Sequence, residues 1–105
     1  MPSPYVGKIR ELFDRQEVAV LGSNMGGMPY LNLVAFIPYH DYRSLIFVTS
    51  KLTRKYANLL SEPAASMMID NRQDKTATLE ARGVTVCGAA HELAPGAEVD
   101  EIIAL

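Results

Sequence analysis

Short strand-forming runs, joined mostly by turns, constrain the fold of this chain more than any other feature. The first two runs are joined by Asn24-Met25-Gly26-Gly27, a sequence that suits a hairpin turn. Parallel strands need a helical crossover between most neighbours, and only one helical segment interrupts these runs, after the third. The sequence therefore predicts a mainly β (α+β) fold, a small antiparallel, Greek-key-like barrel. The expected strands are 18–23, 29–37, 45–49, 65–70 and 78–93.

Two helices are expected to accompany this barrel, one N-terminal and one inserted. Ser3-Pro4 is typical of a helix start, and the first helix should reach about Gln16. The second helix spans about 53–62, and Pro63 ends it. The buried stripe of the first helix is expected to hold Tyr5, Ile9, Leu12 and Phe13. That of the second is expected to hold Tyr56, Leu59 and Leu60.

The composition indicates one ordered domain over 1–105, since 49% of the residues are hydrophobic and 21% are charged. A net charge of −2 excludes bulk electrostatic attraction to nucleic acid or to an anionic membrane. No apolar run approaches the ~18 residues of a membrane span, and the N-terminus lacks the apolar core of a signal peptide. We therefore expect a cytoplasmic protein.

The length of the chain, its C-terminal end and its single cysteine lead to three further expectations. A domain of 105 residues gains core by dimerising. Residues 99–105 begin a helix that the chain end cuts off, so we expect a truncated C-terminal end. The single cysteine, Cys87, excludes an internal disulfide framework and is expected to be a buried spectator.

Positive charge gathers at the start of the second helix. Thr53 is a suitable N-cap, Arg54 and Lys55 follow it, and Lys51 precedes it. A helix N-terminus already carries the positive end of the macrodipole, where cations are disfavoured. Free N–H groups, a hydroxyl and cations together suit a bound phosphate. The alternative is a solvated face whose charge Glu62 or Asp70 neutralises.

Other candidate chemistry is sparse. His40 and His91 have no converging partners that would indicate a metal site, and no Ser/His/Asp set or carboxylate pair is evident. The segment 70–72 either lines a ligand crevice or forms a turn.

The residues around this helix start carry a family resemblance. The run FVTS, then Thr53, Arg54-Lys55, NLL and Pro63, resembles the FMN-binding split β-barrel family related to pyridoxamine 5′-phosphate oxidase. A second match is Arg82, just upstream of a V-x-V-x-G-x-A strand. The resemblance covers about 18–93.

The resemblance implies a homodimer with FMN at the subunit interface. Thr53, Arg54 and Lys55 would hold the FMN phosphate, and Arg82 would reach in from the partner subunit. The backbone of Val48, with Thr49 and Ser50, would lie along the ribityl chain and the flavin edge. The isoalloxazine would be lined, mainly through backbone groups, by Leu31, Asn32, Leu33 and Val34.

Three departures argue against vitamin B6 oxidation. Leu31 and Phe36 stand where the oxidase has basic residues, and Gly83 stands where it has a flavin-contacting glutamine. The C-terminal extension that carries its substrate-binding residues has no counterpart here.

We therefore expect an FMN-dependent oxidoreductase that is not specific for vitamin B6. No side chain is an evident acid or base, so hydride or electron transfer to or from the flavin is the expected reaction. The alternatives are a non-catalytic flavin or haem carrier, for which His91 is the haem candidate, and a dimerisation module without cofactor.

Overall fold

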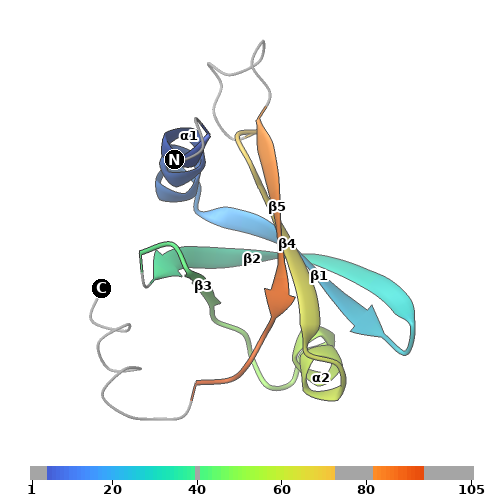
Figure 1. Ribbon diagram of the computed structural model, residues 1–105. Coiled ribbons are helices and arrows are strands. Elements are labelled where there is room, and N and C mark those ends of the chain that lie inside the picture. The colour runs from blue at the N-terminus through green and yellow to red at the C-terminus, as the bar shows by residue number, and fades with distance from the viewer. Residues whose placement is uncertain (1–4, 40, 73–81, 94–105) are drawn as a thin grey trace.

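The computed structural model describes residues 5–39, 41–72 and 82–93 (Figure 1). Its five strands form one antiparallel sheet in the order β3-β2-β1-β4-β5. The sheet curls into a half-barrel with α1 near one end and α2 near the other, which confirms the predicted antiparallel, mainly β fold (Figure 1). The elements are α1 Val6–Arg15, β1 Val18–Met25, β2 Met28–Tyr39, β3 Ser44–Phe47, α2 Arg54–Ser61, β4 Ala64–Asp70 and β5 Gly83–Ala89.

The β1–β2 hairpin turns where the sequence predicts. Met25 pairs with Met28, so the loop has two residues, Gly26 and Gly27. Their φ angles are 58° and 93°, a region that glycine enters without strain and that matches the twist of a hairpin. The Gly27 N–H donates to the Asn24 side-chain oxygen at 2.9 Å, which closes the turn.

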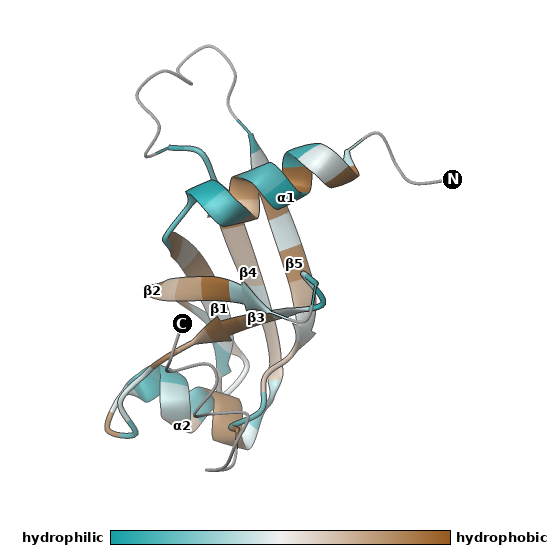
Figure 2. Ribbon diagram, turned by 90° about the vertical axis from the view of Figure 1, so that its left-hand side faces the viewer, coloured by the Kyte–Doolittle hydropathy of each residue, from teal (hydrophilic) through white to brown (hydrophobic). Residues whose placement is uncertain are grey.

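The core lies on the inner face of the curled sheet, beneath α1. Leu21 of β1 and Ile69 of β4 are fully buried, and Phe13 of α1 packs edge-on against Phe36 with ring centroids 6.4 Å apart. Figure 2 shows the apolar side of α1 turned toward the strands and its polar side turned outward. The buried apolar residues are Leu12, Phe13, Ala19, Leu21, Val34, Phe36, Met67 and Ile69.

Three details differ from the sequence prediction. Tyr5 is exposed because it precedes α1 as its N-cap residue, so it cannot join the buried stripe. Cys87 is exposed, not buried, because it alternates onto the outer face of β5. The last strand ends at Ala89, after which the Ala90 N–H donates to the Pro63 carbonyl. The proposed helix start at residues 3–4, segment 78–81 and the helix at 99–105 lie outside the described residues.

A buried polar contact fastens α2 to the sheet. Asn58 is only 4% exposed, and its Nδ2 donates to the Ser23 Oγ of β1 at 3.1 Å. Leu60, predicted in the buried stripe, is 64% exposed. The helix therefore turns an asparagine toward the sheet, because the polar contact with Ser23 sets its rotation. This contact positions the N-terminus of α2 relative to β1.

We expect Ser23→Ala to destabilise the protein by about 1–3 kcal/mol, because it leaves the buried Asn58 amide without its acceptor. Denaturant unfolding measures the change. Ser61→Ala, at the exposed end of the same helix, is the matched control and should stay within about 0.5 kcal/mol. Equal effects from the two variants would contradict the anchoring role of the contact.

Candidate functional site

Hydrogen bonds between three hydroxyl-bearing residues build the start of α2. Thr53 has extended backbone angles (φ −87°, ψ 156°), and its Oγ1 accepts from the Tyr56 N–H at 3.4 Å, which confirms the predicted N-cap. The same hydroxyl donates to the Ser50 carbonyl at 2.8 Å and lies 3.0 Å from Thr49 Oγ1. The connector between β3 and α2 is thereby folded onto the first turn of the helix. The structure brings Thr49, Ser50 and Thr53 together at the start of α2.

The cations of this turn are largely uncompensated. Within the described part of the chain, Arg54 and Lys55 have no ion-pair partner, and the first turn of α2 holds no acidic residue. Lys51 does have a partner, Glu92, with Nζ 3.4 Å from Oε1. Because a helix N-terminus disfavours cations by typically ~0.3–1 kcal/mol each, Arg54 and Lys55 are placed against their own electrostatic preference.

The carboxylates named as alternatives do not neutralise these cations. Glu62 lies at the opposite end of α2, where its Oε1 accepts from the Ala64 N–H at 3.2 Å. Asp70 accepts from Arg72 Nε at 2.7 and 2.9 Å, and this contact holds the pKa of Asp70 below its usual range. Among the described cations of this turn, Glu92 pairs with Lys51 alone, a contact that no local sequence pattern could predict because 41 positions separate the two residues.

The four β2 residues predicted to line a flavin do not share one face. Leu31 and Leu33 are 68% and 66% exposed on the outer face, whereas Val34 is buried in the core on the inner face, which Asn32 shares. Strand geometry dictates this split, because successive side chains point to opposite faces. Side chains from all four residues therefore cannot line one surface.

Alternate backbone groups of the same segment share one accessible edge of the sheet. The Phe36 N–H donates to the Glu17 carbonyl, so even-numbered peptide groups of β2 face β1 and odd-numbered ones face the other edge. On that edge β3 pairs only with 36–39, and it ends at Phe47, short of the predicted Thr49. Among the described residues, the peptide groups of Leu31 and Leu33 thus face an open sheet edge.

Asn32 contributes a buried acceptor with no partner. Its Oδ1 is inaccessible to solvent and makes no hydrogen bond. Asn32 pairs with Leu21, two residues from the pair of Tyr30 with Ser23, which is the residue that α2 contacts. An unsatisfied buried acceptor is costly, by about 1–3 kcal/mol, and a ligand N–H or O–H would satisfy it.

Arg82 lies far from this helix start within one chain. Its N–H donates to the Asn71 side-chain oxygen, just beyond the end of β4. α2 lies beyond the other end of that seven-residue strand, so roughly 20 Å separates the two sites (Figure 1). Arg82 can approach an FMN site at α2 only from a second copy of the chain.

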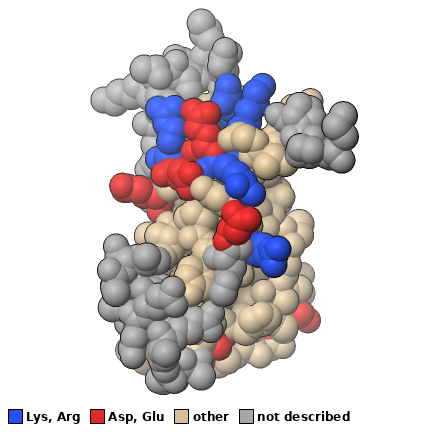
Figure 3. All heavy atoms as spheres, turned by 60° about the vertical axis from the view of Figure 1, so that its left-hand side comes forward, with Lys and Arg blue, Asp and Glu red and all other residues tan. Residues whose placement is uncertain are grey.

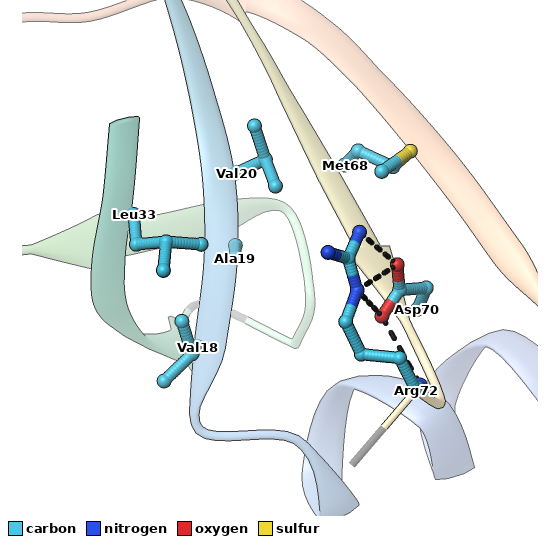
Figure 4. A pocket seen from close by; sticks show the side chains of 7 residues that line it. All are labelled: Val18, Ala19, Val20, Leu33, Met68, Asp70 and Arg72. Carbon is cyan, nitrogen blue, oxygen red and sulfur yellow. Dashed lines mark hydrogen bonds and ion pairs between the residues drawn. The ribbon is translucent and has the colours of Figure 1, made fainter. Parts of the chain in front are cut away.

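The outer face of the sheet is mostly apolar and carries a shallow hollow of about 90 Å³. Figure 4 shows its walls, where Leu33 and three β1 residues face Met68 and the Asp70–Arg72 pair. In Figure 3 the charged side chains gather toward the end of the molecule where α1 lies, and most of the described surface below them is uncharged. Ligand pockets usually measure about 300–1,000 Å³, so this hollow cannot enclose a flavin.

The other candidate residues do not form a metal site within the described part of the chain. The described residues contain no cluster of metal-ligating side chains, and His91 is exposed. His40 lies outside the described residues. No helix of the described chain is long and apolar enough to cross a membrane. The segment 70–72 forms a turn in which the Arg72 N–H donates to Asp70 Oδ1, and its ion pair borders the outer hollow.

Comparison with known proteins gives a family and a fold. The model of the family described as pyridoxamine 5′-phosphate oxidase matches residues 6–104. No curated protein matches. The haem storage protein HutZ from Vibrio cholerae has 17% identity and a TM-score of 0.78, with 97% of this chain and 72% of that one covered.

Two further structures are similar. For a haem-binding protein from Mycobacterium smegmatis the identity is 21% and the TM-score 0.80, with 99% of this chain and 42% of that one covered. A candidate pyridoxamine 5′-phosphate oxidase from Listeria innocua has 23% identity and a TM-score of 0.70, with 92% of this chain and 72% of that one covered. Identities this low show the fold alone. The chain spans 42–72% of the length of these three structures and 64% of another match.

We expect Asn32→Leu to raise the stability of the ligand-free protein by about 1 kcal/mol, because it replaces an unsatisfied buried acceptor with an apolar group of similar size. Denaturant unfolding without added ligand measures this. A loss of stability would show that the Asn32 carboxamide has a partner in the free protein.

Proposed function

Because the chain belongs to the pyridoxamine 5′-phosphate oxidase family, we propose that it binds FMN, with the phosphate at the first turn of α2. The observation that carries this proposal is the pair of cations at Arg54 and Lys55, which have no carboxylate partner in the described chain. Free N–H groups of the same turn add donors, and the Thr53 hydroxyl, which already donates to the Ser50 carbonyl, holds the turn in place. A phosphate there would offset the charge that the helix end disfavours.

The residues at the other end of the site also fit a flavin. The open edge of β2 offers alternating N–H and C=O groups at Leu31 and Leu33, which match the donors and acceptors of an isoalloxazine rim. The buried Oδ1 of Asn32 lacks a donor that a ligand could supply. Thr49 and Ser50, which contact Thr53, would lie along the ribityl chain.

We propose that the protein works as a homodimer. The outer sheet face exposes large apolar side chains, including Leu31 and Leu33, which a second copy would cover. The interface would also supply the dry crevice that a 90 Å³ hollow in one chain cannot provide. Arg82 of the partner subunit would then reach the cofactor of this one.

The activity we propose is flavin-dependent oxidoreduction, with specificity other than for vitamin B6. The flavin would supply the redox chemistry. The chain would clamp the phosphate, exclude water at the interface and leave an opening for a substrate. Glu92, the carboxylate that contacts this turn, is held by Lys51 and Tyr56, so direct hydride or electron transfer is the reaction that these residues support.

A haem carrier is the second candidate. It is favoured by two structural neighbours named as haem proteins and by the exposed His91, which follows β5 beside Glu92. The absorption spectrum of the purified protein separates the candidates. Flavin bands support the FMN proposal, a Soret band supports the haem carrier, and a colourless protein that ignores both added cofactors contradicts both. Bleaching of bound flavin by a reduced nicotinamide cofactor under anaerobic conditions would support an enzyme.

We expect Arg54→Ala/Lys55→Ala to weaken FMN binding by about tenfold to a hundredfold, because two charge-assisted contacts to the phosphate are lost. Riboflavin, which lacks the phosphate, should bind both proteins equally. Fluorescence quenching measures both affinities. The control, Lys8→Ala/Arg43→Ala, removes the same charge from exposed positions outside α2. An unchanged FMN affinity in the first variant would contradict the phosphate assignment.

We expect Leu33→Lys to shift the protein toward monomer, because it places a charge in the middle of the apolar outer face. Sedimentation velocity measures the change in mass. Val6→Lys, on exposed α1, is the control and should leave the assembly unchanged. A wild-type protein that is monomeric at micromolar concentration, with FMN added, would rule out the dimer.

A further inference from the structure

We infer that Glu92 is a built-in competitor of the phosphate at the first turn of α2, and so sets how strongly the site prefers a phosphorylated ligand. This rests on the proposed function. Glu92 Oε1 lies 3.4 Å from Lys51 Nζ, and Oε2 accepts from the Tyr56 hydroxyl at 3.0 Å. Lys51 is two residues before the N-cap Thr53 and Tyr56 is three residues after it. One carboxylate therefore bridges both sides of the helix start.

The reason for this placement is electrostatic. A helix N-terminus favours negative charge, and α2 has no acidic residue in its own first turn. Glu92, from the segment that follows β5, supplies that charge through space. The hydrogen bond to Glu92, desolvation and the charge of Glu92 raise the pKa of Tyr56. Glu92 thus places a negative charge beside two side chains that flank the site proposed for the phosphate.

A bound ligand can displace the ion pair between Lys51 and Glu92. The side chains of Lys51 and Glu92 are 73% and 49% exposed, and ion pairs this exposed are weak. A phosphate dianion would attract Lys51 away from Glu92. The Tyr56 hydroxyl would still hold Glu92 near the site, so its charge would repel the phosphate that has arrived. A neutral ligand such as riboflavin would meet neither effect.

A structural role for Glu92 predicts the opposite result. If Glu92 mainly tied the β3–α2 connector to the end of β5, removing its charge would disorder the site and weaken binding. Glu92→Gln separates the two roles, because glutamine keeps an oxygen that accepts from Tyr56 and loses only the charge. Tyr56→Phe is the complement, since it removes the hydrogen bond and leaves the charge.

The experiment compares Glu92→Gln with Glu62→Gln, which removes the same charge at the far end of α2. FMN and riboflavin affinities are measured by fluorescence quenching in 20 mM and 1 M salt. We expect Glu92→Gln to bind FMN about three- to tenfold more tightly in low salt, to lose this gain in high salt and to bind riboflavin unchanged. Glu62→Gln should match wild type throughout. Weaker or unchanged FMN binding by Glu92→Gln, or an equal gain for riboflavin, would overturn the inference.

Inorganic phosphate separates failure of this inference from failure of the flavin proposal. Its binding is followed by NMR through the backbone amides of 54–56. If no protein binds FMN, the flavin proposal fails, and tighter phosphate binding by Glu92→Gln than by wild type still supports the competitor role. Equal phosphate binding by the two proteins, or none by either, overturns the inference whatever the FMN result.

Discussion

The change of partner along β2 is the constraint on which the rest of the structure depends. Over 28–35 this strand pairs with β1, and its last four residues, 36–39, pair with β3. Because β3 is short, the chain leaves the sheet at Phe47 and the connector must fold before α2 begins. The open edge of β2, the capped start of α2 and the half-barrel shape all follow from this one arrangement of hydrogen bonds.

The start of α2 is held by weak contacts that cooperate. Thr53 caps the helix and receives its own support from Ser50 and Thr49, while Asn58 fixes the rotation of the helix against β1. Each contact contributes about 1 kcal/mol, yet together they aim the first turn and its cations. The cations contribute nothing to helix stability at that position, and the proposed phosphate site would account for their placement.

Fold likeness alone does not choose between cofactors, because one scaffold can carry several sites. Structural neighbours of this chain are named both for haem and for pyridoxamine 5′-phosphate oxidase. The proposal of FMN therefore rests on the residues of this chain. Arg54 and Lys55 favour a phosphate, whereas Leu31 and Phe36 place no cation on β2 to share one. Under the proposed function, the chain would hold the phosphate at α2 alone, with apolar residues at these two positions of β2.

The sequence alone determined the features that depend on neighbouring residues: the strands, the hairpin at Gly26-Gly27, the N-cap at Thr53 and the cations after it. These features depend on neighbours within a few residues, where turn geometry and capping preferences act. Only the tertiary structure decided that Asn58 and not Leu60 faces the sheet, that Leu33 lies on the outer face and Asn32 on the inner one, and that Glu92 forms an ion pair with Lys51. Those outcomes depend on register and on contacts between residues 35 to 41 positions apart, which no local pattern encodes.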